Sequence, residues 1–557
     1  MSFHNEEDVT LIDQQMDSII DQVEAIKLTK LNPTIDDINM LNDITLQFVK
    51  EKKRKVYGGL SQNKAIEVKN KEDTFYPEDN IADIDIYSPD PINDMIELAN
   101  RYHQQKFQHI QATEAGHKET YAIFVFFRKS IDLSYVPRHA YNNIPTFESE
   151  GIVYVHPDFS MIDMYKIFTD PWFSNFRWEK TIRRVSLLQK HYPIKKATKT
   201  LRPIHRAVKD NNIVSVKSTP NDILKIKKEI NDIILTFLTT TETSFLYGDY
   251  LYNHYIKECN IKKSKIFEPI DIPFMEIIST EYQKDTIDLI KSIVKKYKID
   301  IQEHYPFWTF QNCSTYIMYK KYPVAHICHY NNRCVTSRKI KYDKKEIHVL
   351  SYNYNLMMTM IKKFISKTRN NNELTNYNNI AISHLRELKN IYFKNNPKKN
   401  ILDETLFKQF IIDCHGVVVD PLVENRLRKR KKYLAGKIVT FNYRPDTGGL
   451  KKSDSKYQFA NTSGNYIRNV MNLKITPRVY DIISGSEKKL VDKLKDKKLT
   501  LRGYLDKTIT ENDNRENVNR NFFSVKQQEY DFDDYVDLGP SDIRTDMISE
   551  SSNGRWV

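Results

Sequence analysis

Residues 56–86 decide the fold of this chain: they read VYGGLSQNKAIE, then the polar loop VKNKEDTFYPEDN, then IADIDI. Gly58 and Gly59 lie where a short strand passes into a predicted helix, with Ser61 just inside that helix. Residues without side chains let the backbone approach an anion, and a helix N-terminus directs N–H groups and partial positive charge at it. The pattern predicts a phosphate cradle formed by Gly58, Gly59 and Ser61, with Lys64 as a further phosphate ligand.

Two aspartates follow on the next predicted strand. Asp83 and Asp85 are two residues apart, so the alternation of a strand places both carboxylates on one face and Ile84 and Ile86 on the buried face. Two carboxylates directed at one point suit divalent ions that bridge a nucleoside triphosphate and an attacking hydroxyl. The stretch therefore predicts a nucleotidyl-transfer site that uses two Mg²⁺ or Mn²⁺ ions.

Nucleotidyltransferases of the polymerase-β type need a third carboxylate on an adjacent strand, which accepts the proton of the attacking 3′-hydroxyl and completes the metal coordination. Residues 119–137, ETYAIFVFFRKSIDLSYVP, are typical of a hairpin, and Asp132 lies in its second strand. Asp158 and Asp163 are the alternatives. They occupy a strand exit and a helix, where capping or surface exposure also explains an acid. Asp132 is the expected third carboxylate.

The composition of the 557 residues narrows the class of protein. A hydrophobic content of 40% and an aromatic content of 12% are typical of a globular chain with several domains. The net charge of +14 is clustered along the chain, which favours a polyanionic partner. The five cysteines form no CxxC pair, and no apolar run is long enough for a signal peptide or a membrane span. These features predict a protein of a reducing, cytosol-like compartment without a membrane partner.

The order of the predicted helices and strands along the chain indicates an α/β (α+β) multi-domain protein. The expected parts are an N-terminal helical region (1–50), a catalytic nucleotidyltransferase domain (51–190), a basic connector (191–225), a degenerate nucleotidyltransferase-like domain (226–365), a basic C-terminal region (366–525) and an acidic mobile tail (526–557). Within the C-terminal region, the polar run KTRNNNELTNYNNIAI at 367–382 is expected to be a loop.

Two basic stretches are candidate RNA contacts. Positive charge interleaved with aromatic residues suits single-stranded nucleic acid, whose phosphates pair with cations and whose bases stack. The residues singled out are Lys195, Lys196 and Arg202 in the connector, and Arg428, Lys429 and Arg430 in RLRKRKKYLAGK at 426–437. A solvated linker is the alternative interpretation of the first stretch, and a nuclear-localisation signal is that of the second.

Part of the chain is repeated at an offset of about 190 residues. SFLYGDYLYNHYIKE aligns with KVYGGLSQNKAIE, and three further segments follow in the same order as in the first copy. The catalytic positions are changed: Phe274 replaces Asp83, Glu276 replaces Asp85, Asp249 replaces Gly59, and His326 or Ile327 replaces Asp132. An acid at position 249 would repel a triphosphate, and one carboxylate cannot hold two metal ions. The second copy is therefore expected to be a degenerate lobe that serves as scaffold, RNA platform or dimer surface.

The segments YGGLS (57–61), DIDIYSPDP (83–91), TYAIFVFFRKSIDLSYVP (120–137) and HPDFSMIDMYKIFTDP (156–171) resemble poly(A) polymerase catalytic subunits of large DNA viruses. These belong to the poxvirus and giant-virus branch of the polymerase-β-like nucleotidyltransferases, and the resemblance covers residues from about 45 to 365. It implies template-independent addition of AMP from ATP to the 3′ ends of viral mRNA, with release of pyrophosphate.

The resemblance also implies partners and a location. An RNA 3′ end and ATP are the expected substrates, and either a homodimer or a methyltransferase-like processivity subunit is the expected protein partner. The host cytoplasm (viral factory) is the expected location, with the virion as a second one. Two alternatives stay open at this point: another terminal ribonucleotidyltransferase, of the uridylyl or CCA type, and an inactive RNA-binding subunit.

Overall fold

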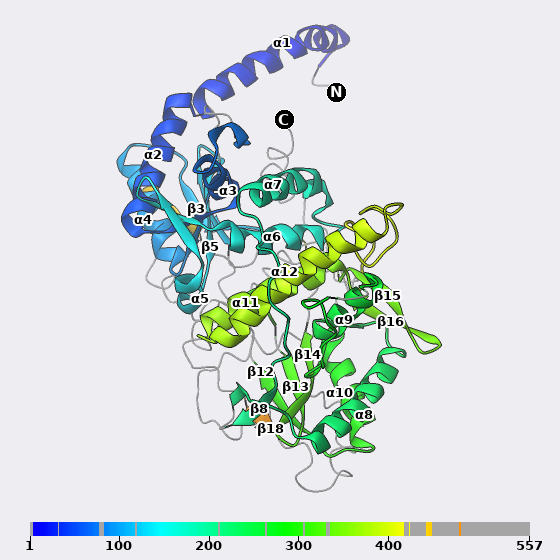
Figure 1. The fold of residues 1–557 in the computed structure, drawn as a ribbon. Coiled ribbons are helices and arrows are strands. Elements are labelled where there is room, and N and C mark those ends of the chain that lie inside the picture. The colour runs from blue at the N-terminus through cyan, green and yellow to red at the C-terminus, as the bar shows by residue number, and fades with distance from the viewer. Residues whose placement is uncertain are drawn as a thin grey trace.

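The computed structural model describes residues 4–31, 33–76, 83–116, 120–209, 212–261, 264–304, 307–312, 314–329, 335–416, 423, 442–447 and 478–480. The chain forms two mixed α/β lobes, the first blue to cyan and the second green to yellow in Figure 1. The predictions for Arg428, Lys429 and Arg430 and for the acidic tail at 526–557 lie outside the described residues.

The N-terminal region consists of two helices, as predicted, α1 (Glu6–Leu31) and α2 (Ile35–Lys52). A capping box starts α2: the Asp37 N–H donates to Thr34 Oγ1 at 3.1 Å, and the Thr34 N–H donates to Asp37 Oδ2 at 2.8 Å. Both bonds satisfy N–H groups that a helix start leaves without a partner. Phe48 and Val49 of α2 are fully buried against the first sheet, so this helix is part of the catalytic lobe rather than a separate region.

The first lobe is an eight-stranded mixed sheet in the order β17-β3-β4-β5-β2-β1-β7-β6. Its strands are β1 (Lys55–Tyr57), β2 (Ile84–Ser88), β3 (Gln111–Glu114), β4 (Thr120–Val125), β5 (Arg128–Tyr135), β6 (Thr146–Ser149), β7 (Ile152–Val155) and β17 (Asn442–Tyr443). The central strand β2 is antiparallel to β1 and parallel to β5. Helices α2 and α4 (Pro91–Gln104) share a hydrophobic cluster with Ile84 and Ile86, which leaves the opposite face of β2 to Asp85.

The second lobe repeats this topology. Its sheet has the order β15-β16-β10-β11-β14-β13-β12-β18, with the same parallel and antiparallel pairings around the central strand β11. The strands are β10 (Ser244–Tyr247), β11 (Met275–Ser279), β12 (Asp300–His304), β13 (Ser314–Tyr319), β14 (Tyr322–His329), β15 (Ser337–Tyr342), β16 (Lys345–Leu350) and β18 (Arg478–Tyr480). The small hairpin of β8 (Arg206–Lys209) and β9 (Asn212–Ser215) forms a separate two-stranded sheet.

Matching side-chain contacts confirm that the repeat seen in the sequence is structural. In the first lobe the Ser88 hydroxyl donates to Asp94 and accepts from the Asp90 N–H. In the second lobe Ser279 Oγ donates to Asp285 Oδ2 at 2.6 Å and accepts from the Glu281 N–H at 3.0 Å. Both pairs tie the end of the central strand to the first turn of the following helix.

The remaining helices surround and join the two sheets. They are α3 (Gly58–Glu67), α5 (Arg138–Asn143), α6 (Pro157–Phe168) and α7 (Trp178–His191) in the first lobe, and α8 (Asn221–Leu238), α9 (Asp249–Glu258), α10 (Tyr282–Val294), α11 (Tyr352–Thr368) and α12 (Asn372–Asn395) in the second. Short 3₁₀ turns are η1 (Lys71–Asp73), η2 (Asn175–Arg177) and η3 (Pro445–Thr447). One continuous hydrophobic cluster runs through both lobes, with Phe159 of α6 against Phe364 of α11 at 4.8 Å between ring centroids.

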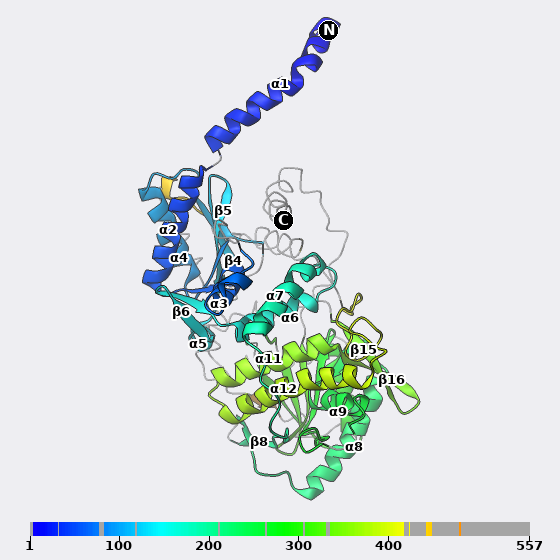
Figure 2. The same cartoon turned by 45° about the horizontal axis from the view of Figure 1, so that its top comes forward.

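Two expectations about the C-terminal region are wrong. The run at 367–382 is not a loop, because most of it lies in helix α12, where Asn371 caps the helix by accepting from the Leu374 N–H at 2.9 Å. The proposed boundary at residue 365 falls inside α11, and α12 packs on α9 and α11 as part of the second lobe. Figure 2 shows α11 and α12 side by side. Polar sequence misled here because Asn side chains also cap and cover helices.

The described cysteines are of two kinds. Cys259 and Cys328 are buried and free, whereas Cys414 is disulfide-bonded. Within the described ranges, no helix is both long and apolar enough to cross a membrane.

Candidate active site

Asp85 and Asp132 lie side by side on the face of the first sheet that is opposite α2 and α4. They are register partners on the parallel strands β2 and β5, so their carboxylates leave the sheet in the same direction. Asp83 directly precedes β2, is exposed, and raises the pKa of Asp85 through its charge. The structure therefore pairs Asp85 with Asp132 and leaves Asp83 just before the same strand, close enough for its charge to act on Asp85.

The electrostatics of Asp85 are those of a buried acid beside other acids. Burial, and after it the charges of Asp132 and Asp83, raise the pKa of Asp85 to about 7, although Lys129 partly offsets the effect. Lys129 Nζ donates to Asp132 Oδ2 at 2.8 Å. A β-bulge explains this contact: Ser130 is an extra residue between two pairs of the β4–β5 ladder, so Lys129 and Asp132 face the same side although they are three residues apart.

The carboxylates fit divalent metal ions by residue type and placement. Asp132 Oδ1 is buried and has no hydrogen-bond partner among the described residues, which is costly for a carboxylate oxygen unless a cation or a donor binds there. In the described part of the chain, no three His, Cys, Asp or Glu side chains are gathered closely enough to hold an ion in their present arrangement. Lys129 Nζ supplies positive charge at Asp132 Oδ2, and Oδ1 stays open to an ion.

Gly58 and Gly59 form the cradle at the start of α3. Gly58 has φ of +71°, and a Cβ atom at this position would lie 2.4 Å from Asp85 Oδ2. Only glycine combines that backbone conformation with so close an approach to the carboxylate. The predicted cradle and the face that carries Asp85 therefore meet at Gly58.

The predictions for Ser61 and Lys64 are not supported by their side chains. Ser61 is fully buried, and its hydroxyl donates to the Val155 carbonyl oxygen at 2.8 Å, which fixes α3 on β7. Lys64 Nζ forms ion pairs with Glu150 at 2.6 Å and with Glu67 at 3.1 Å. Ser61 follows Gly59 by two residues and Lys64 follows it by five, and the partners of both side chains lie away from the glycines.

A cation that the sequence reasoning did not assign to the cradle reaches it from α7. Arg184 Nη1 would lie 3.1 Å from a Cβ atom on Gly59, and its guanidinium lies over the Phe75 ring at 4.3 Å. Its Nη2 donates to the Tyr76 hydroxyl at 3.0 Å. The basic run containing Arg184 was visible in the sequence, but only the packing of α7 on α3 shows that one of its members faces the glycines.

Two further cations lie on the same side of α7 as Arg184. Lys180 is one helical turn before it, and Arg177 precedes the helix. Burial and the positive charges of Arg184 and Arg177 lower the pKa of Lys180, while Asp83 acts in the opposite direction. Arg177 in turn acts to lower the pKa of Asp85. This electrostatic coupling places positive charge at the edge of the acidic site, where a triphosphate would need it.

Asp158 and Asp163, the alternative candidates for the third carboxylate, have other surroundings. Asp163 accepts a hydrogen bond from the Tyr87 hydroxyl at 3.1 Å, within the packing of α6. Asp158 is exposed in the first turn of α6, 3.9 Å from Lys363 Nζ. Neither is a register partner of Asp85, so the structure favours Asp132 as the third carboxylate.

The connector at 191–225 presents its predicted RNA-binding residues to solvent. Lys195, Lys196 and Arg202 are all exposed. The backbone between them is fixed to α12, where the Ala197 N–H donates to Glu387 at 2.8 Å and a His384 ring nitrogen lies 2.8 Å from the Lys199 carbonyl oxygen. The surface is thus accessible to a nucleic acid, and the RNA-binding role of these residues stays a prediction.

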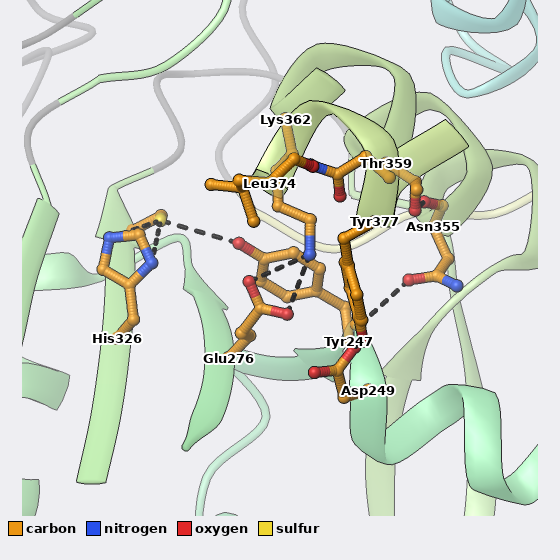
Figure 3. Close-up of polar contacts among 12 residues, drawn as sticks. Tyr247, Asp249, Glu276, His326, Asn355, Thr359, Lys362, Leu374 and Tyr377 are labelled. Carbon is orange, nitrogen blue, oxygen red and sulfur yellow. Dashed lines mark hydrogen bonds and ion pairs between the residues drawn. The ribbon is translucent and has the colours of Figure 1, made fainter. Parts of the chain in front are cut away.

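The second lobe carries a closed counterpart of this site (Figure 3). Glu276 and His326 are register partners on β11 and β14, so His326 rather than Ile327 takes the place of Asp132. Lys362 Nζ from α11 binds both oxygens of Glu276, at 2.8 and 3.0 Å. The Tyr377 hydroxyl donates to Asp249 Oδ1 at 2.5 Å. Side chains of the chain itself therefore satisfy the acids that remain.

No room for a nucleotide is left among the described residues at this second position. The cavity beside Glu276, Lys362 and Tyr377 has a volume of about 20 Å³, which is enough for about one water molecule. Burial, and after it the charge of Glu276, raise the pKa of Asp249. The lobe keeps the fold of the first and its left-handed glycine, Gly248, but has Asp249 and Phe274 in place of Gly59 and Asp83, in agreement with the prediction of a degenerate copy.

Comparisons with known proteins give the family. Residues 42–174 match the family model "Poly(A) polymerase catalytic subunit", and residues 211–476 match "APMV, Putative poly(A) polymerase, catalytic subunit, C-terminal". The chain is 30% identical over 502 residues to the "Putative poly(A) polymerase catalytic subunit" of Acanthamoeba polyphaga mimivirus, covering 84% of this chain and 83% of that protein.

Two further comparisons agree with this match. A protein of the same description from African swine fever virus (strain Badajoz 1971 Vero-adapted) is 30% identical over 166 residues, 28% of this chain and 34% of that protein. The crystal structure of the Megavirus polyadenylate synthase matches with a TM-score of 0.69 and 29% identity, over 82% of this chain and 90% of that chain. The chain described here therefore belongs to the viral poly(A) polymerase catalytic subunit family.

Proposed function

We propose that this chain is a poly(A) polymerase that adds AMP from ATP to the 3′ end of RNA. The observation that carries the proposal is the pairing of Asp85 with Asp132 on adjacent strands, with the Gly58 backbone beside Asp85. The likeness to viral poly(A) polymerases over more than four-fifths of the chain supports adenylate as the transferred group.

Each residue of the site has a distinct role in this reaction. The Gly58–Gly59 backbone and Arg184 bind the phosphates of ATP and orient its α-phosphorus toward the primer. Asp132 accepts the proton of the primer 3′-hydroxyl at Oδ1, the buried oxygen without a partner among the described residues. The hydroxyl oxygen then bonds to the α-phosphorus while the bond to the β-phosphate oxygen breaks, and pyrophosphate leaves. Positioning and neutralisation of charge supply most of the acceleration.

Asp83, Asp85 and Asp132 would hold the divalent ions, Mg²⁺ or Mn²⁺. When bound, such ions neutralise charge on the phosphates and stabilise the attacking oxygen as it loses its proton. The near-neutral pKa of Asp85 reflects burial and the repulsion among the three acids, which a cation at this point would relieve.

An extension assay tests the proposal directly. The full-length protein is given a short 5′-labelled RNA, each NTP separately, and Mg²⁺ or Mn²⁺. We expect extension with ATP, and a loss of about a thousandfold in Asp83→Ala, Asp85→Ala and Asp132→Asn. Asp158→Asn is the control, because Asp158 is exposed and is not a register partner of Asp85.

The possible outcomes separate the alternatives. Retained extension in Asp85→Ala would overturn the site assignment. A preference for UTP or CTP would identify another terminal ribonucleotidyltransferase, and no extension by any NTP would favour an RNA-binding subunit. Ladders that stop after a few adenylates would indicate a missing processivity factor, whether a second copy of the chain or a methyltransferase-like subunit. RNA binding and thermal stability of the variants are measured alongside, so that misfolding is not mistaken for loss of chemistry.

A further inference from the structure

The turn between β4 and β5 has two phenylalanines in a backbone conformation that favours glycine. Phe126 and Phe127 are its two central residues, with φ of +52° and +63°. Hairpin turns with positive φ at both positions usually contain Asn-Gly or Asp-Gly, because a bulky side chain is strained there. The β6–β7 turn of the same sheet has Glu150 at φ of +55° and Gly151 at +77°. The β4–β5 turn therefore carries backbone strain at Phe127, where the other turn has glycine.

Packing does not account for Phe127. The Phe126 ring lies 6.1 Å from that of the buried Phe107, within the hydrophobic cluster of the first sheet, whereas Phe127 is 65% exposed. The Phe127 ring stacks on His109 at 4.6 Å between centroids and 27° between planes, and His109 is itself exposed with φ of +53°. Strained residues of this kind concentrate at functional sites. The exposed pair is a flat aromatic surface of the type on which nucleic-acid bases stack.

The second lobe provides a comparison. Its β13–β14 hairpin is the counterpart of β4–β5, and its two-residue turn consists of Lys320 and Lys321, which are both exposed. Lys320 has φ of +53°, so a positive φ is kept at this turn while the aromatic residues are not. The exposed aromatic side chain is thus found in the lobe that has Asp85 and Asp132, and it is not a requirement of the hairpin.

The β4–β5 turn lies on the primer side of the active site. β2 and β5 are parallel and β1 is antiparallel to β2, so β2 and β5 begin at the edge of the sheet where β1 ends, next to Gly58. The strand order β4-β5-β2-β1 then places Asp132 on the side of the turn and the cradle on the other side of Asp85. In phosphoryl transfer the attacking and leaving oxygens lie roughly in line. With pyrophosphate leaving at Gly58 and the proton acceptor at Asp132, the primer reaches the site from the side of the turn.

We propose that the stacked rings of Phe127 and His109 bind a base of the RNA primer a few nucleotides upstream of its 3′ end. The inference rests on the proposed polymerase function and names the surface that positions its RNA. Phe127 precedes Asp132 by about five residues, or roughly 15 Å of strand. At about 3.4 Å per stacked nucleotide, this spans roughly three to five nucleotides. Arg128, which is exposed beside Phe127, supplies a cation for the phosphates of the same segment.

Phe127→Asn in the full-length protein is the first test, because asparagine tolerates a positive φ and removes the ring. In single additions of 3′-deoxy-ATP to a 5′-labelled RNA, we expect the KM for RNA to rise roughly 10- to 100-fold and the KM for the nucleotide to stay unchanged. The temperature of unfolding should stay the same or rise by about 2 °C. Phe127→Tyr keeps the ring and is the matched control, with the KM of the parent for RNA. An unchanged KM for RNA in Phe127→Asn, a less stable Phe127→Asn protein, or equal impairment of Phe127→Tyr would overturn the proposal.

Primers with a single abasic ribose locate the stacked base. In the parent protein, loss of one base at roughly three to five nucleotides from the 3′ end should raise the KM for RNA. The same primer should give no further rise in Phe127→Asn, because the partner of that base is already missing. Equal penalties in both proteins would overturn the proposal. A parent protein that extends no primer with any NTP would refute the polymerase function and this inference together, whereas normal extension by Phe127→Asn would refute the inference alone.

Discussion

Asp85 and Asp132 are register partners on parallel strands, and the same register in the second lobe pairs Glu276 with His326. The two lobes thus have the same strand pairing and differ in the side chains at the central register pair. In the first lobe burial and the neighbouring acid raise the pKa of Asp85. In the second, Lys362 binds Glu276 and burial holds the pKa of His326 well below its usual range, so that the imidazole is neutral. The first lobe keeps a negative site whose charge Lys129 offsets only in part, and the second lobe has neutralised it.

The left-handed glycine of the cradle gives the first prediction. Gly58→Ala places a methyl group at φ of +71° and against Asp85 Oδ2, so we expect a loss of activity of about a hundredfold and a loss of about 1–2 kcal/mol in stability. Gly151→Ala is the matched control, because Gly151 has φ of +77° but its Cβ would meet only the flexible end of Lys50. Thermal unfolding and kcat should show similar destabilisation in both variants and inactivation in Gly58→Ala alone. Equal inactivation of both would mean that strain, not the active-site contact, causes the loss.

Arg184 is predicted to bind the triphosphate. Its guanidinium faces Gly59 and stacks on Phe75, and a hydrogen bond to a charged group contributes about 1.5–3 kcal/mol. We expect Arg184→Ala to raise KM for ATP by roughly 10- to 100-fold and to weaken inhibition by inorganic triphosphate to the same extent. The KM for RNA should change little, which separates this role from that of an RNA contact.

The neighbouring residue provides the control for this prediction. Arg183 is largely exposed and pairs with the equally exposed Glu179 at 2.6 Å. Arg183→Ala should leave the KM for ATP unchanged. If the two variants behave alike, or if Arg184→Ala affects only RNA, the assignment of Arg184 to the triphosphate is wrong.

The sequence predicts a side chain's position best where one local rule is sufficient. The alternation of a strand predicts the face to which Asp85 points, and internal alignment at a constant offset locates Glu276 as its counterpart in the second lobe. The sequence predicts less where the outcome depends on packing between distant segments. The burial of Ser61 depends on β7, and the position of Arg184 depends on how α7 crosses α3. A helix start alone does not say which of its side chains will face the ligand.

The bulge in β5 is a third feature that the sequence does not reveal. In a regular strand, residues three apart point to opposite faces, so Lys129 would have been placed away from Asp132. The extra residue Ser130 reverses this expectation. The polar run of α12 shows the converse error, since its composition favours a loop while its contacts with α9 and α11 make it a helix.

The ion pair of Lys362 and Glu276 is predicted to affect the stability of the protein but not its catalysis. Lys362→Met leaves a buried carboxylate unpaired, which should lower the free energy of unfolding by about 3 kcal/mol. Glu276→Gln in the same chain should recover most of the loss, because the uncompensated charge is removed. Neither the single nor the double variant should change kcat per folded molecule, in contrast to Asp85→Ala. Denaturant unfolding and extension assays measure the two effects, and a catalytic defect in Glu276→Gln would show that the second lobe takes part in the reaction.

Lys227 predicts a pH dependence of stability that is independent of the active site. This lysine of α8 is only 4% exposed, its ammonium donates to the Pro273 carbonyl oxygen, and burial lowers its pKa to about 8. An ordinary lysine has a pKa of about 10.5 in the unfolded chain, so folding below pH 8 carries a cost of about 3 kcal/mol for burying the charge. The cost decreases as the pH rises from 8 toward 10.5, because the folded protein has then already released the proton that the unfolded chain still binds.

Lys227→Met should therefore be more stable than the parent at pH 7, by about 2 kcal/mol once the lost hydrogen bond is subtracted. The gain should shrink above pH 8 and disappear or change sign by about pH 10.5. Lys228→Met, at the exposed neighbouring position, should show no such trend. Unfolding curves of the three proteins between pH 6 and pH 10.5 test this, within the range where lysine titrates. A gain that is constant across this range would mean that the introduced methionine stabilises by packing alone and that the buried ammonium carries no cost.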